Sequence, residues 1–178
     1  MRKEPLLYGL GCLMLLFSCN NPSGSSKEHS ALELVTKAGE NYSLGKLRNG
    51  HVSNNNGVIA ISDSVFKYVL ETKGIVYGRI DADTLTDAVL SVKVFQGVAP
   101  VRVEHIVLLK SEKGFNHAAT MNKIFKVRRV ENNSIVAEYT DLPFDSPIYG
   151  CTECIRVYKY KLEGKDLVKT DSLKYTDK

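Results

Sequence analysis

Strand-like runs, each closed by a turn signal, fill the chain from Tyr42 onward and restrict its fold more than any other feature. The runs are apolar or alternate between apolar and polar residues, which is typical of strands. They are expected at residues 44–48, 51–53, 58–62, 65–71, 74–80, 88–95, 101–110, 123–130, 134–139, 151–162 and 167–170. No helical crossover, which parallel strands need, lies between them. The pattern predicts a mainly β fold, a β-rich α+β chain with an antiparallel sheet, sandwich or barrel.

The first two of these runs flank Asn49-Gly50, which is the strongest two-residue hairpin signal. A tight turn is therefore expected there. Residues 115–122 are ambiguous and fit either a helical turn or a loop.

One short N-terminal helix is expected at residues 30–38. Ser30 can cap its first turn, and Glu33 falls three residues later, as in a capping box. Gly39 follows and can end the helix.

The start of the chain has the pattern of an export signal. Met1-Arg2-Lys3 is a short basic start, and Leu6–Phe17 is an apolar run. That run is too short to span a membrane, which needs ~20 residues, but it suits the core of a signal peptide. Residues 1–18 are expected to be removed, and Cys12 with them.

The run ends in Leu16-Phe17-Ser18-Cys19, which resembles the lipobox of bacterial lipoproteins. The resemblance implies that Cys19 becomes the first mature residue and carries acyl chains such as palmitate, because stable anchoring needs more than one chain. Residues 19–29 then form a flexible tether, and residues 30–178 form a single β-rich domain. The alternative is an ordinary signal peptide followed by an incidental cysteine.

A lipid at Cys19 implies a protein attached to a membrane of the bacterial cell envelope. The residues after Cys19 lack the acidic run that marks surface export, which favours the periplasmic side.

The charge of the chain argues against a nucleic-acid partner. The net charge of +4 falls to +3 without residues 1–18, which is too little for that class. The densest basic cluster is Lys126, Arg128 and Arg129. Lys126 and Arg128 alternate with Val127 and Val130, which predicts that they form the solvent face of a strand; binding to anionic lipid headgroups is the secondary alternative.

Three carboxylates, Asp81, Asp83 and Asp87, lie at near-alternate positions between two apolar runs. Such spacing can gather oxygen atoms around one point, as a calcium loop does. The alternative is a metal-free turn in which Asp side chains accept hydrogen bonds from backbone N–H groups, and this second interpretation is preferred.

Residues 78–89 resemble the G-D-x-N-G-D-G-x-x-D-A-V element of calcium-loop repeats, single degenerate copies of which occur in uncharacterised bacterial envelope lipoproteins and periplasmic proteins. The resemblance places Asp81, Asp83 and Asp87 at ligand positions. Arg79 stands where the first carboxylate belongs, and Thr84 replaces the turning glycine. Arg79 is expected to pair with a nearby carboxylate in place of the ion.

Cys151 and Cys154 form a C-x-x-C pair before a β-like run. In an oxidising compartment such a pair predicts a local disulfide, here one that fixes residues 141–150 to their strand. A thiol–disulfide protein is the alternative. Zinc would need two further ligands, and His105 and His117 occur singly.

No G-x-S-x-G or H-E-x-x-H motif supports an enzyme. Asp141 and Asp145 lie in a Pro-rich loop and are interpreted as turn formers. The tyrosines of the later strands, Tyr139, Tyr149, Tyr158 and Tyr160, fit either strand positions or an aromatic ligand surface. The sequence thus predicts a non-catalytic envelope lipoprotein with a binding or structural role towards an envelope protein or a glycan. Its alternatives are a calcium-stabilised module using Asp81, Asp83 and Asp87, and a thiol–disulfide protein using Cys151 and Cys154.

Overall fold

The computed structural model describes residues 25–143, 146–147 and 151–173. The predicted signal segment, Cys19, Asp145 and Tyr149 lie outside these residues. The elements are α1 (Ser25–Leu44), β1 (His51–Asn55), β2 (Val58–Ser62), β3 (Phe66–Leu70), η1 (Thr72–Gly74), β4 (Val76–Gly78), β5 (Asp87–Gln96), β6 (Ala99–Ser111), β7 (Gly114–Met121), β8 (Ile124–Glu131), β9 (Ser134–Tyr139), η2 (Thr152–Cys154), β10 (Arg156–Glu163) and β11 (Asp166–Leu173). Among the described residues, no helix is both long and apolar enough to cross a bilayer.

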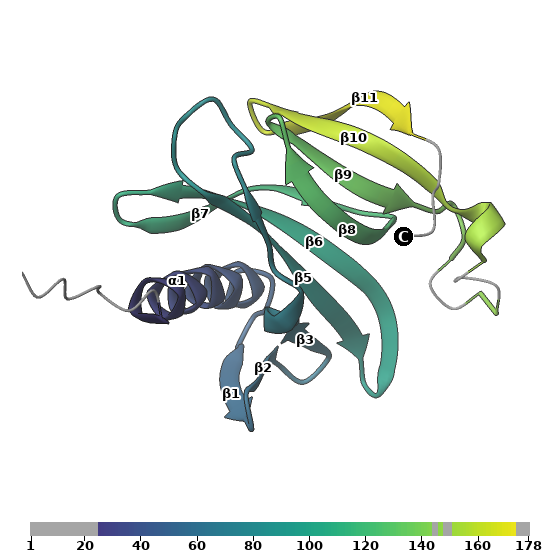
Figure 1. Cartoon of the computed structure of the whole chain (residues 1–178). Helices are drawn as coiled ribbons and strands as arrows, with labels where there is room; N and C mark the ends of the chain where they lie inside the picture. Colours follow the sequence, from purple (N-terminus) through teal and green to yellow (C-terminus); the bar gives the residue numbers. More distant parts are fainter. Residues whose placement is uncertain (1–24, 144–145, 148–150, 174–178) are drawn as a thin grey trace, which may run out of the picture.

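The strands form two antiparallel sheets, which confirms the predicted fold class (Figure 1). The first sheet has the order β1-β2-β3-β5-β6-β7, and β4 also pairs with β5. The second has the order β11-β10-β9-β8. The helix α1 lies on one face of the first sheet, and the second sheet lies on the other face. The molecule is an open β-rich sandwich and not a closed barrel.

The strand β5 shows how alternation builds two cores. Ala88, Leu90, Val92 and Val94 are buried in the core beneath α1. Val89, on the opposite face of the same strand, is buried in the core shared with the second sheet. A central strand covered on both faces therefore appears in the sequence as a nearly continuous apolar run.

The helix α1 is longer than the sequence predicts, because it begins at Ser25, inside the expected tether, and ends at Leu44. Gly39 does not stop it. A Cβ at Gly39 would lie 2.5 Å from Leu90 Cδ2 and 3.2 Å from Leu70 Cδ1. The glycine therefore lets the helix approach the sheet closely.

The strand expected at residues 44–48 and the tight turn expected at Asn49-Gly50 are wrong, whereas the strand expected at residues 51–53 is confirmed as the start of β1. Leu44 ends α1, and Leu44 and Leu47 pack at the edge of the core beneath the helix, so tertiary packing overrides the local signal. The tight turn lies instead at Asn56-Gly57, between β1 and β2, where φ is 53° and 81°. Positive φ at both positions fits a type I′ hairpin turn.

Three other boundaries differ from prediction. Residues 115–121 are neither a helical turn nor a loop, because β7 spans Gly114–Met121 and pairs with β6; only Asn122 lies in a loop. The run at 74–80 contributes only β4, since η1 occupies its start. The run at 151–162 begins as a strand at Arg156, after η2.

Candidate functional site

Asp87, the last carboxylate of the Asp-rich turn, is fully buried at the start of β5. Its Oδ2 accepts a hydrogen bond from the Ile80 N–H at 2.7 Å. Its Oδ1 accepts one from the Lys110 N–H of β6 at 2.9 Å. Asp87 thus joins the two ends of the turn and ties them to the neighbouring strand.

Asp81 and Asp83 hold the turn itself. Asp81 Oδ1 accepts from the Asp83 N–H at 3.0 Å, and Asp83 Oδ1 accepts from the Leu85 N–H at 2.7 Å. These are Asx turns, so the Asp side chains accept hydrogen bonds from backbone N–H groups of the turn as predicted. Desolvation raises the pKa of the Asp81 carboxyl above its usual range, and the nearby charges of Asp87 and Asp83 act in the same direction.

The prediction that Arg79 pairs with a carboxylate in place of a calcium ion is wrong. Its side chain is exposed and forms no ion pair with a carboxylate of the described chain. The described residues also contain no group of three or more His, Cys, Asp or Glu side chains arranged to hold a metal.

We expect thermal unfolding of the full chain to give the same midpoint in millimolar calcium and in chelator. Both oxygens of Asp87 face backbone N–H groups, so this carboxylate has little left to offer an ion. An ion that binds only the folded state would stabilise it by about 2.7 kcal/mol at a hundred times Kd. A calcium-dependent rise that disappears in Asp83→Ala but persists in Asp166→Ala would make the turn an ion site.

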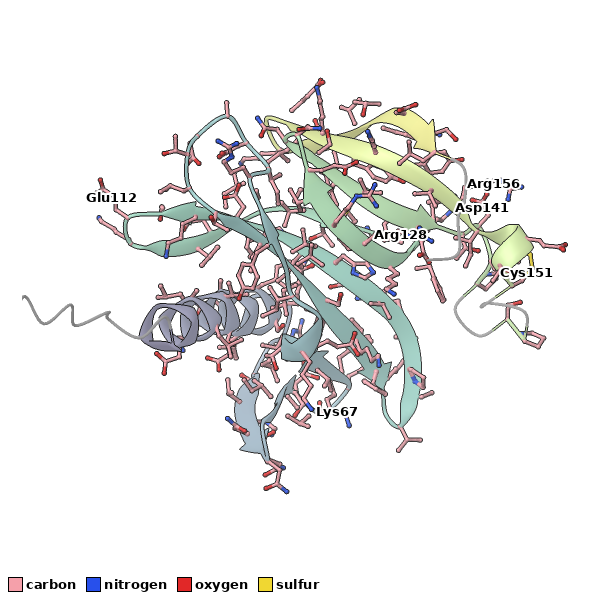
Figure 2. The ribbon with its side chains drawn as sticks, in the orientation of Figure 1. Lys67, Glu112, Arg128, Asp141, Cys151 and Arg156 are labelled. Atoms are coloured by element: carbon pink, nitrogen blue, oxygen red, sulfur yellow. A yellow bond between two sulfur atoms is a disulfide. The ribbon has the colours of Figure 1, made fainter. Side chains whose placement is uncertain are left out.

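Cys151 and Cys154 are joined in a disulfide, with their Cα atoms 5.2 Å apart. The bond closes the short turn η2 just before β10. Figure 2 shows Cys151 at the opposite end of the molecule from Glu112, which marks the hairpin between β6 and β7. The disulfide therefore lies where the chain re-enters the second sheet.

Of the two histidines considered as zinc ligands, His105 has its ring nitrogens engaged within the protein. His105 is buried, and its Nε2–H donates to the Ile124 carbonyl at 3.0 Å. Its Nδ1 must then accept from the Ser91 hydroxyl at 2.8 Å. Burial lowers the pKa of His105, so its neutral imidazole serves as a buried cross-link between the sheets.

The later tyrosines come together on the second sheet. Tyr158 packs edge-on against Tyr139 and Tyr160, with ring centroids 5.8 and 6.4 Å apart. Lys169 Nζ lies 4.2 Å from the centroid of Tyr158. Burial raises the pKa of Tyr160 to about 12, and this tyrosine also packs against the core between the sheets.

The predicted basic cluster on β8 is only partly a solvent face. Lys126 is exposed, as expected, and Arg129 is exposed too. Arg128 instead donates from Nε to the buried Glu138 at 2.6 Å.

A groove of about 430 Å³ lies between the end of α1 and β7. Its walls combine rings, amides and one ammonium group; they are Ala38, Asn41, Tyr42, Gly45, Lys46, Phe115, Asn116 and His117. The Tyr42 and His117 rings are 4.6 Å apart, and Lys46 Nζ lies 5.1 Å from the Tyr42 centroid. This volume is in the range of small-molecule sites.

A directed chain of hydrogen bonds runs from this groove into the protein. The Tyr42 hydroxyl donates to Glu104 Oε2 at 3.0 Å, because a carboxylate only accepts. The Thr120 hydroxyl must therefore donate to the Tyr42 oxygen, 3.2 Å away. Thr120 Oγ1 then accepts from His117 Nε2 at 2.9 Å. The chain fixes the orientations of the Tyr42 and His117 rings.

Glu104 is the buried end of this chain, with 5% of its surface exposed. Arg102 Nε donates to Glu104 Oε1 at 2.7 Å and compensates the buried charge. Burial raises the pKa of Tyr42 to about 12, so the phenol stays protonated. The hydrogen bond from Thr120 lowers this pKa, and the charge of Glu104 raises it. Burial likewise lowers the pKa of His117, and nearby Lys46 lowers it further.

Sequence reasoning missed this groove. Tyr42 and Glu104 are 62 residues apart, and no spacing rule connects them. The one available signal was Glu104, a carboxylate inside the apolar run 101–110, where a charge must find a partner.

The fold and site thus define an open β-rich sandwich with a ligand-sized groove beside its helix. No protein-family model, curated protein or solved structure matches the chain. The resemblance of residues 78–89 to calcium-loop repeats stays a prediction.

Proposed function

We propose that the protein is a lipid-anchored bacterial envelope protein whose β domain has a non-catalytic binding role. Anchoring is supported by the sequence around Cys19, where a basic start and an apolar run precede a lipobox-like motif. Because α1 begins at Ser25, the domain would stand on a short link from the membrane.

The single observation that carries the binding role is the groove between α1 and β7. Its ring walls are held by the chain from His117 to Glu104, so the cavity is pre-formed, which lowers the cost of binding a ligand. Other polar groups are engaged in holding the fold: Asp87 bonds the backbone, and His105 links Ser91 to Ile124.

Acylation of Cys19 tests the anchoring. When the full chain is expressed in bacteria with radiolabelled palmitate, we expect it to be labelled and to sediment with membranes. Cys19→Ser should abolish both results, because the thioether is the site of attachment. The matched control is Cys12→Ser, which should keep the label. Label that persists in Cys19→Ser would refute the proposal.

A further inference from the structure

We propose that the groove between α1 and β7 binds a small organic carboxylate attached to a ring-sized body. This inference deepens the proposed binding role and rests on it. The groove is shallow and open to solvent, so a ligand can enter without unfolding any element.

The charge of the groove favours an anion. Lys46 is the charged residue of its wall, and no carboxylate lines it. Glu104, the nearest acidic group of the hydrogen-bond chain, lies behind the Tyr42 ring and is paired with Arg102. The wall therefore presents a cation whose charge no lining carboxylate neutralises.

Most of the carbonyl groups at the end of α1 are hydrogen-bonded and do not face this charge bare. The carbonyls of Asn41, Ser43 and Leu44 accept hydrogen bonds from the N–H groups of residues 45–47, at 3.0 to 3.1 Å. These bonds satisfy acceptors that a helix end otherwise leaves exposed. Lys46 lies in this wall, and Lys110 Nζ lies 4.8 Å from the centroid of Phe115, so a second cation borders the same groove.

The shape of the groove favours a flat or ring-shaped body. Tyr42 and His117 form a tilted ring pair at 46°, and Phe115 belongs to the same wall. The amides of Asn41 and Asn116 border the rings. Asn116 Nδ2 donates one of its two N–H groups to Ser111 Oγ at 3.1 Å and keeps the other for a ligand. When a carboxylate binds beside Lys46, the ring attached to it packs against these aromatic side chains. An inorganic anion has no ring and cannot make these contacts.

The test is binding of two carboxylates and their neutral isosteres to the full chain in detergent, measured by NMR. Benzoate is compared with benzamide, and glucuronate with glucuronamide. We expect at least one carboxylate to bind about tenfold or more tightly than its amide, because hydrogen bonds to charged groups contribute roughly 1.5–3 kcal/mol. Which pair responds identifies an aromatic ring or a sugar ring as the body.

Lys46→Met keeps the apolar stem, removes the charge, and should weaken carboxylate binding about tenfold or more. Lys113→Met, in the turn between β6 and β7 and outside the groove, should bind as the unchanged chain does. Bound carboxylate should also raise the pKa of His117, since a nearby negative charge favours imidazolium.

Three results would overturn the proposal: amides that bind as tightly as the acids, Lys46→Met with unchanged affinity, or inorganic phosphate that binds as tightly as either carboxylate. None of these results affects acylation of Cys19, so failure of the groove and failure of membrane anchoring are separable.

Discussion

Asp87→Asn should destabilise the protein by about 2–4 kcal/mol, although it changes side-chain volume very little. The Asp87 carboxylate is fully buried and accepts from the N–H groups of Ile80 and Lys110. An amide has one acceptor oxygen, so its NH₂ group must face one of these two backbone donors. The backbone N–H that faces this NH₂ group loses its hydrogen-bond acceptor, and the two donors repel each other. The loss is measured from urea unfolding as the change in the free energy of unfolding.

The matched control is Asp83→Asn in the same turn. Asp83 is exposed, and its single bond to the Leu85 N–H can be replaced by water, so we expect a cost below about 1 kcal/mol. Hydrogen exchange gives a local readout: in Asp87→Asn the amide of Ile80 or Lys110 should lose protection. Equal costs for the two variants would show that Asp87 is not the residue that closes the turn.

The sequence contains enough to predict the Asp-rich turn and the sheets, because both depend on short-range patterns. Asp81 and Asp83 act on backbone groups two residues ahead, which any Asx turn does. Alternation along β5 places Leu90 and Val89 on opposite faces without reference to the rest of the chain. The disulfide is equally local, because a separation of three residues joins Cys151 to Cys154.

The wrong predictions come from contacts between distant segments. Gly39 resembles a helix stop, but it lies inside α1, where the absence of a side chain lets the helix pack closely against Leu90. Asn49-Gly50 resembles a hairpin signal, but Leu47 packs at the edge of the core beneath α1. Local propensity is a weak prior that tertiary packing overrides.

The groove could not be predicted for the same reason. Its defining bonds join Tyr42 on α1 to Glu104 on β6 and Thr120 on β7. From a single sequence, it is not known which residues of these three elements lie side by side until the order of the strands in the sheet is known. What the sequence does offer is Glu104, a carboxylate inside an apolar run. Arg102, two residues earlier, donates to one of its oxygens, and the other oxygen accepts from the distant Tyr42.

Gly78→Ala should destabilise the protein by about 1–3 kcal/mol through a clash between the sheets. Gly78 ends β4 of the first sheet, where a Cβ would lie 2.5 Å from Val130 Cβ and 2.7 Å from Val130 Cγ1 of β8. Val130 packs against the core between the sheets, so it has little room to move. Urea unfolding should give a lower free energy of unfolding with an unchanged dependence on urea.

Gly74→Ala is the matched control, because a Cβ there meets no atom within 4 Å. The same change of residue type should then be neutral or slightly stabilising, since alanine restricts the unfolded chain more than glycine does. The clash has a further test in the Val130→Gly background, which removes both contacting atoms. There Gly78→Ala should cost much less than in the unchanged chain. An equal cost in both backgrounds would place the effect in β4 itself, and Gly78 would not be the residue that sets the approach of the two sheets.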